Sequence, residues 1–236
     1  MLYFFVISLT FCLSILWLVR RTDARGLGRN QALDLALVLM ISGFLGARLA
    51  HVVFEEPAYY AENPWRVFEV WKGGFVWLGG AIAGGLAGIL FARSRKLEPP
   101  LWLDLFAPIA AFGYAAGRVA CWIVGCCYGA YCHLFEGVTF RYPTQAFAVF
   151  WESGILTLLL YLEHLRRTAR APLWAQKPGR LFSLWILLHS IGRMIMEQFR
   201  GDPRGPEPFG LSLATWISLG LILSVAVIEN RRSMKN

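Results

Sequence analysis

Three arginines, Arg48, Arg118 and Arg193, stand inside long apolar stretches of the sequence. An arginine within membrane hydrocarbon costs at least ~2.5 kcal/mol, so each needs a stabilising partner or a function. At 1.5 Å per helical residue they lie roughly 26, 26 and 20 Å from the basic ends of their stretches, hence at one depth in the outer half of a membrane. Planar guanidinium groups suit phosphate oxygens. The spacing therefore predicts an anion site.

Two neighbours on the same predicted helix offer Arg193 a structural alternative. Glu197 follows it by four residues and His189 precedes it by four, which places the three side chains in one column. Any of the arginines could instead pair with a carboxylate or extend to the outer interface. For three arginines at one depth we favour a functional site.

Further polar groups are predicted at the same depth. Tyr3 begins the first apolar run, Thr144 and Gln145 begin the fifth, and a glycine-rich turn, residues 71–80, opens the third. A polar pocket at this level could admit a lipid headgroup while the acyl chains stay in the bilayer.

Four of the five cysteines gather near the end of the fourth run, at Cys121, Cys126, Cys127 and Cys132. Outside the membrane a disulfide involving Cys132 is allowed. A zinc site would have unusual spacing and no supporting pair of histidines, so no metal is expected. A nucleophilic thiol activated by Arg118 is a third reading. Packing or a structural disulfide is favoured over both.

The elements that carry these residues are predicted to be membrane helices. The chain has 236 residues, of which 57% are hydrophobic and 16% charged, with a mean hydropathy of +0.50. Soluble domains carry about a quarter charged residues. We therefore expect an all-α polytopic membrane protein forming one domain over residues 1–236, with about seven helices near residues 2–19, 31–54, 74–92, 101–127, 144–164, 180–199 and 210–229. The first run is read as a retained helix rather than a signal peptide.

Basic residues predict the orientation of these helices. Fifteen of the 23 lysines and arginines lie in the connections after the first, third and fifth runs and in the C-terminal tail. By the positive-inside rule the N-terminus is outside and the C-terminus cytoplasmic, which suits a multi-pass protein of a bacterial inner membrane. The net charge of +8 is explained by these membrane ends, so no nucleic-acid partner is expected.

Glycines recur at four-residue spacing in two predicted helices. Gly80, Gly84 and Gly88 form one stripe; Gly113 with Gly117, and Gly125 with Gly129, repeat the pattern. Such stripes allow close contact between membrane helices. Packing is the preferred reading for most of them.

Several motifs, in order along the chain, resemble those of prolipoprotein diacylglyceryl transferases. Residues 113–129, GYAAGRVACWIVGCCYG, are similar to the family signature G-R-x-G-N-F-x-N-G-E-x-x-G. Supporting similarities lie in GFLGARLAHVVF, WKGGFVWLGGAIAGG, DLFAPIAAFG, YPTQAFAVFWESG and HSIGRMIMEQFRGDP. The resemblance covers nearly the whole chain.

This resemblance implies transfer of a diacylglyceryl group from phosphatidylglycerol to the lipobox cysteine of a prolipoprotein, at the outer face of the inner membrane. Arg118 and Arg193 match residues regarded as essential and would stabilise the leaving phosphate. No cofactor is implied, and the partners are phosphatidylglycerol, the lipobox peptide and membrane lipids. With the polar groups above, the substrate-binding set comprises Tyr3, Arg48, Gly79, Cys121, Gly129, Gln145, His189, Glu197 and Arg200.

The chain departs from the family pattern at several positions. Leu78 replaces a histidine, while Cys121, Val124 and Cys126 replace two asparagines and a glutamate of the signature. A later G-Q element is missing around residues 214–215. A transferase with another acceptor that uses Cys126 and Cys127, a non-catalytic lipid-binding protein and, least favoured, a transporter are the alternatives.

Overall fold

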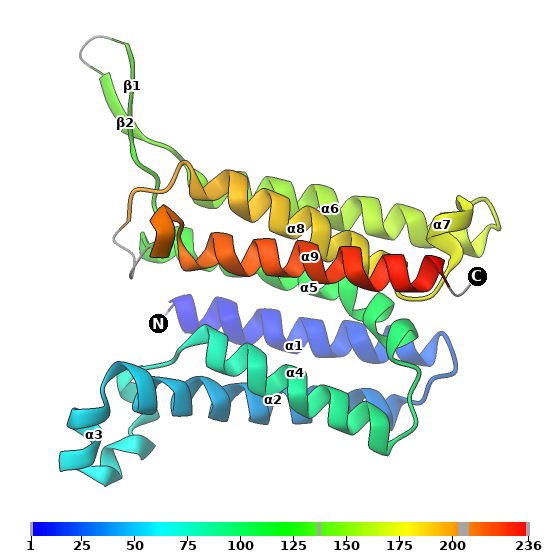
Figure 1. The fold of residues 1–236 in the computed structure, drawn as a ribbon, viewed down its shortest axis with the longest axis horizontal. Coiled ribbons are helices and arrows are strands. Elements are labelled where there is room, and N and C mark those ends of the chain that lie inside the picture. The colour runs from blue at the N-terminus through cyan, green and yellow to red at the C-terminus, as the bar shows by residue number, and fades with distance from the viewer. Residues whose placement is uncertain (1, 136–137, 203–207, 235–236) are drawn as a thin grey trace. The chain divides into compact units, whose positions relative to one another are not determined.

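The structure is a computed structural model that describes residues 2–135, 138–202 and 208–234. The chain forms two compact units (Figure 1). One comprises the residues up to Leu18 and those from Pro100 onwards, and the other comprises Val19–Pro99. Helix α1 (Leu2–Asp23) begins in the first unit and ends in the second.

The first unit is built mainly from long helices. After α1 it contains α5 (Pro99–Val124), α6 (Thr144–Arg167), the short α7 (Leu173–Gln176), α8 (Arg180–Glu197) and α9 (Leu213–Ser233). Helix α8 packs against both α6 and α9, and the three run side by side in Figure 1. A buried apolar core joins α5, α6, α7 and α8 through Ala107, Ile155, Leu159, Leu162, Ala175 and Leu181.

A buried carboxylate fixes the start of α8. Asp104 of α5 accepts hydrogen bonds from the backbone N–H groups of Gly179 (2.9 Å) and Phe182 (3.0 Å) and pairs with Arg166 at 2.8 Å. These contacts satisfy N–H groups that have no partner within a helix at its N-terminus. Asp104 thus ties α5, α6 and α8 together at the end opposite the predicted site.

The second unit is a pair of helices with an irregular connection. Helix α2 (Arg29–Ala50) runs into a π-helical turn, His51–Glu55, followed by α3 (Pro57–Glu62), two 3-10 turns (Pro64–Phe68 and Val70–Lys72) and α4 (Trp77–Ser94). Glycines bring α2 and α4 close together. A Cβ added at Gly79 would overlap Ala50 and the carbonyl oxygen of Gly46, and one at Gly80 would lie 2.8 Å from the carbonyl oxygen of Gly43.

The seven predicted runs each correspond to a long helix, and the all-α membrane fold is confirmed. Within the described residues, five helices are long and apolar enough to cross a membrane: Phe5–Asp23, Arg29–Glu55, Pro99–Val124, Thr144–Arg167 and Leu213–Ser233. Helix α4 contributes a shorter apolar stretch, Gly79–Ser94. Helix α8 is shorter, with 18 residues, and carries three charged side chains, Arg180, Arg193 and Glu197.

The structure adds a hairpin after α5 and distinguishes the two glycine stripes. After α5, β1 (Tyr131–Phe135) and β2 (Val138–Arg141) pair as an antiparallel hairpin. The stripe at Gly80, Gly84 and Gly88 faces α2 as predicted. In contrast, a Cβ at Gly113 or Gly117 would meet no described atom of its unit within 4 Å.

Candidate active site

Four polar side chains from three helices form a connected network in the first unit. The Arg118 Nη2 group on α5 donates a 2.7 Å hydrogen bond to the hydroxyl of Tyr114, one turn earlier. The Tyr114 ring meets the His189 ring of α8 edge-on, with centroids 4.5 Å apart. His189 Nδ1 lies 2.5 Å from a carboxylate oxygen of Glu152 on α6. Arg118 is thereby connected to a buried carboxylate through two aromatic side chains.

The network borders a small pocket between α5, α6 and α8, with room for little more than a water-sized group. Its lining is Tyr114, Ala148, Trp151, Glu152, His189, Gly192, Arg193 and Met196. The predicted site residues His189 and Arg193 therefore share one cavity. Arg118 reaches its edge through Tyr114.

Sequence reasoning missed Glu152 and Tyr114, although both carried a signal. Glu152 is a carboxylate eight residues inside the predicted run 144–164, where a charged group needs a partner or a function. Tyr114 precedes Arg118 by four residues and so shares its helix face. The side chain of Glu152 is only 2% exposed, so its pairing with His189 stabilises it.

A second series of charges continues from the end of α8. Arg193 donates a 2.5 Å hydrogen bond to Glu197, as the column on this helix predicted. Arg200 lies 3.9 Å from Glu197 and forms two hydrogen bonds with Asp202, at 2.8 and 2.5 Å. Burial lowers the pKa of Arg200, but the hydrogen bonds to Asp202, together with the charges of Asp202, Cys127 and Glu197, outweigh this effect and raise it. Both arginines therefore have carboxylate partners.

Arg118 differs from these arginines in its surroundings. Among the described residues no carboxylate pairs with its guanidinium, which donates to the hydroxyl of Tyr114, stacks on its ring and lies near the thiols of Cys121 and Cys127. A partly buried cation that no carboxylate of the described residues neutralises is costly in an apolar environment. Arg118 is thus the cation best placed to receive an anion from outside the chain.

Arg48 has a different environment in the second unit. It is buried, and its guanidinium donates four hydrogen bonds to the carbonyl oxygens of Val67 (3.0 Å), Gly73 (2.5 Å), Gly74 (3.1 Å) and Arg66 (2.9 Å). Gly74 has φ +81°, and a Cβ there would lie 2.7 Å from Arg48 Nη1. Arg48 therefore braces the glycine-rich connection.

Two predicted binding residues hold the backbone at the end of α5. Gln145 Nε2 donates a 2.7 Å hydrogen bond to the carbonyl oxygen of Cys126. Gly129 pairs with Arg200 in an isolated β-bridge, and a Cβ at Gly129 would overlap the carbonyl oxygen of Tyr142. This glycine lets three chain segments meet beside the site.

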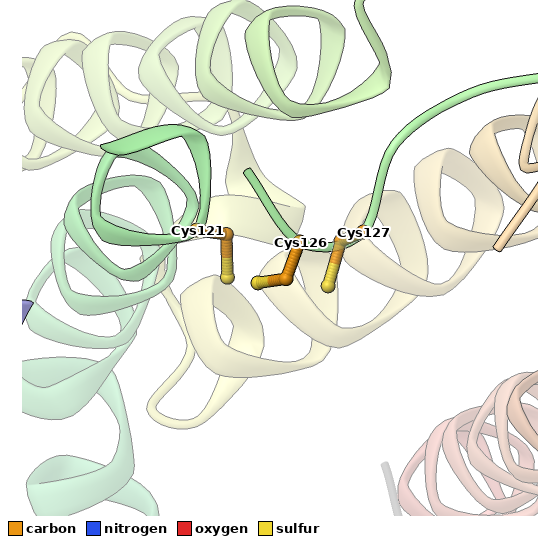
Figure 2. A group of neighbouring side chains, drawn as sticks. All are labelled: Cys121, Cys126 and Cys127. Carbon is orange, nitrogen blue, oxygen red and sulfur yellow. The ribbon is translucent and has the colours of Figure 1, made fainter. Parts of the chain in front are cut away.

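Three cysteines converge at this turn. The Sγ atoms of Cys121, Cys126 and Cys127 all lie within 4.8 Å of one another, and Figure 2 shows them gathered beside the end of α5. A hydrogen bond from the Cys121 thiol lowers the pKa of Cys127 to about 5, and the charges of Arg118 and Arg200 add to this effect against the cost of burial. Burial raises the pKa of Cys126. All five cysteines are free thiols, and Cys132 is buried in β1.

Three further positions named from the sequence are Tyr3, Leu78 and Gly79. The side chains of Tyr3 and Leu78 lie outside the described residues, although both positions are helical. Gly79 lies on the face of α4 that contacts α2, where a Cβ would overlap Ala50 and the backbone of Gly46.

Comparisons with known proteins agree with the motifs. A family model described as prolipoprotein diacylglyceryl transferase matches residues 1–229. The chain is 30% identical over 234 residues to a phosphatidylglycerol–prolipoprotein diacylglyceryl transferase of Geobacter sulfurreducens, covering 92% of this chain and 86% of that protein. The corresponding protein of Clostridium tetani is 29% identical over 229 residues, covering 92% and 87%. A second such transferase of Clostridium perfringens is 28% identical over 245 residues, covering 99% and 91%.

Proposed function

Because the chain belongs to the prolipoprotein diacylglyceryl transferase family, we propose that it moves the diacylglyceryl group of phosphatidylglycerol to the lipobox cysteine of a prolipoprotein. The sulfur of the acceptor attacks the glyceryl carbon, the C–O bond breaks, and glycerol phosphate leaves with the electron pair. The two units together form one catalytic domain in this proposal.

The observation that carries the proposal is Arg118. Its guanidinium has a hydroxyl partner and no carboxylate partner among the described residues, and it lies in a helix apolar enough to span a membrane. The phosphodiester of a phospholipid is the anion available at such a position. Negative charge increases on that phosphate as the C–O bond breaks, so a preorganised guanidinium stabilises the transition state more than the bound lipid.

The other polar groups position this cation. Glu152 orients His189, whose ring packs against Tyr114, and the Tyr114 hydroxyl holds one edge of Arg118. Because the Arg118 side chain is held in this way, its other N–H groups keep a fixed direction. Arg193 remains oriented by Glu197 at the cavity and supplies a second, partly neutralised positive group. Arg48 contributes through the shape of its own unit.

The lipid reaches this site from the bilayer. Many large apolar side chains on the long helices are exposed, among them Leu9, Leu16, Ile41, Phe150 and Leu223, as expected where a protein contacts acyl chains. We place the multi-pass protein in a bacterial inner membrane, with the end of α5 and the β1–β2 hairpin at the outer face. The prolipoprotein acceptor approaches from that side.

The test is transfer of labelled diacylglyceryl from phosphatidylglycerol in detergent micelles to a lipobox peptide by the purified protein. Arg118→Ala should reduce kcat/KM by at least about a hundredfold, since one transition-state donor contributes roughly 10²–10³ in rate. Arg118→Lys, which keeps the charge but loses the planar fork, should retain part of the activity.

The matched control is Arg95→Ala. Arg95 is exposed and pairs with Asp34 at 3.3 Å in the second unit, so its loss should change the rate little. A peptide with serine in place of cysteine should accept nothing. Full activity of folded Arg118→Ala protein would refute the assignment of the phosphate to this arginine.

A further inference from the structure

The three clustered thiols form a donor set that the arginine network leaves unused. Cys121 lies in the last turn of α5, and Cys126 and Cys127 lie in the turn that follows. Their Sγ atoms are mutually within 4.8 Å, and all three residues are partly exposed (Figure 2). An incoming molecule can therefore reach them.

The backbone holds this arrangement in place. The Cys126 N–H donates to the carbonyl oxygen of Cys121 at 3.1 Å, and Cys127 adopts a positive φ of 58°, which is uncommon for a residue other than glycine. The buried side chains of Thr144 and Gln145 donate to the carbonyl oxygens of Cys127 (2.8 Å) and Cys126 (2.7 Å). The start of α6 thus fixes the turn so that both adjacent thiols face Cys121.

Three convergent thiols are a ligand set for a thiophilic metal ion. Tetrahedral zinc with Zn–S bonds of about 2.3 Å places its sulfurs roughly 3.8 Å apart, which small side-chain rotations would reach from the present arrangement. Carboxylate- and water-preferring ions such as magnesium do not suit sulfur donors. Sites with three protein ligands keep the fourth position open for water or substrate.

We propose that Cys121, Cys126 and Cys127 bind a zinc ion whose fourth position takes the acceptor cysteine of the prolipoprotein. This inference rests on the proposed transfer and adds the means by which the acceptor thiol is activated. Zinc with three thiolates carries one net negative charge. Arg118, which precedes Cys121 by three residues on the same helix face, lies beside that charge.

The reaction then proceeds without a protein side chain as base. The acceptor thiol coordinates zinc and releases its proton to solvent, because a coordinating thiol is deprotonated. Its sulfur attacks the glyceryl carbon, and the C–O electron pair leaves on the glycerol phosphate oxygen near Arg118. The resulting thioether is a poor zinc ligand and dissociates. Zinc keeps its oxidation state throughout.

The first experiment measures metal in full-length protein purified in detergent after growth with zinc. Elemental analysis should find one zinc per chain. Cys121→Ser, Cys126→Ser and Cys127→Ser should each lose most of it, whereas Cys12→Ser and Cys132→Ser, which alter thiols outside the cluster, should retain it. The site is wrong if the wild-type protein holds no zinc, or if the three serine variants keep all of theirs. It is also wrong if protein alkylated directly after purification contains a disulfide within the cluster.

A second measurement needs no variant and tests the fourth position. Cobalt(II) in place of zinc should give thiolate-to-metal charge-transfer bands, which should strengthen when a lipobox peptide is added and not when its cysteine is replaced by serine. An unchanged spectrum with the cysteine peptide would refute coordination of the acceptor.

Transfer assays separate this inference from the proposed function. Chelator-treated protein should lose at least about tenfold in rate and recover with zinc. If chelated protein and the serine variants transfer diacylglyceryl at full rate, the zinc site is wrong and the family activity stands. If the protein binds zinc through these thiols but transfers nothing to the peptide, the proposed function is wrong. The role of zinc in activating the acceptor thiol is then wrong as well.

Discussion

At the scale of residues, Arg118 donates a hydrogen bond to Tyr114, whereas Arg193 and Arg200 donate to carboxylates. Tyr114→Phe removes the 2.7 Å hydrogen bond to Arg118 and keeps the ring that packs against His189. Because a hydrogen bond to a charged group contributes about 1.5 kcal/mol, kcat/KM for diacylglyceryl transfer should fall about tenfold with little change in melting temperature.

The β1–β2 hairpin supplies a matched control for this substitution. There Tyr131 accepts a 2.9 Å hydrogen bond from Arg141, and its side chain is exposed. Tyr131→Phe should therefore leave the rate almost unchanged. Equal losses in the two variants would show that Tyr114 has no special role in positioning Arg118.

The residue scale also shows which contacts a sequence can predict. The pair Arg193–Glu197 follows from four-residue spacing on one helix, and the structure confirms it. His189 and Glu152 lie on different helices, 37 positions apart in the sequence, and no local pattern specifies such a partner. Likewise, the bonds from Arg48 to backbone carbonyl oxygens depend on the path of an irregular connection.

At the scale of elements, the close approach of α2 and α4 depends on glycine. Gly79→Ala would place a methyl group against the backbone of Gly46 and the side chain of Ala50, neither of which can move without separating the helices. Overpacking of this kind costs about 1–3 kcal/mol. The melting temperature in detergent should therefore fall.

Gly85→Ala is the comparison on the same helix. A Cβ at Gly85 has no described atom within 4 Å, so this variant should melt at the wild-type temperature or slightly above it, given the better helix propensity of alanine. If both variants melt alike, Gly79 is not a packing residue, and its predicted role in substrate binding gains support.

The sequence predicts the ends of an element where a long apolar stretch determines them. The predicted runs and the observed long helices agree to within several residues, because crossing a membrane requires an uninterrupted helical stretch. The hairpin was missed because β1 and β2 are only five and four residues long. Gly113 and Gly117 repeat the spacing of a packing stripe, yet their spacing alone cannot say whether another helix lies opposite.

At the scale of the whole molecule, charge distribution predicts the orientation that transfer requires. The excess of basic residues after the first, third and fifth helices and in the tail predicts an external N-terminus and a cytoplasmic C-terminus. A green fluorescent protein fused after residue 236 should then fluoresce, and alkaline phosphatase inserted at residues 136–137 should be active. In the reverse orientation the fluorescent fusion, exported in unfolded form, would stay dark and the phosphatase would be inactive. That result would place the end of α5, with Arg118 and the three thiols, toward the cytoplasm. Acceptor cysteines presented at the outer face could then not reach the site, so this measurement tests the proposed reaction as well as the topology.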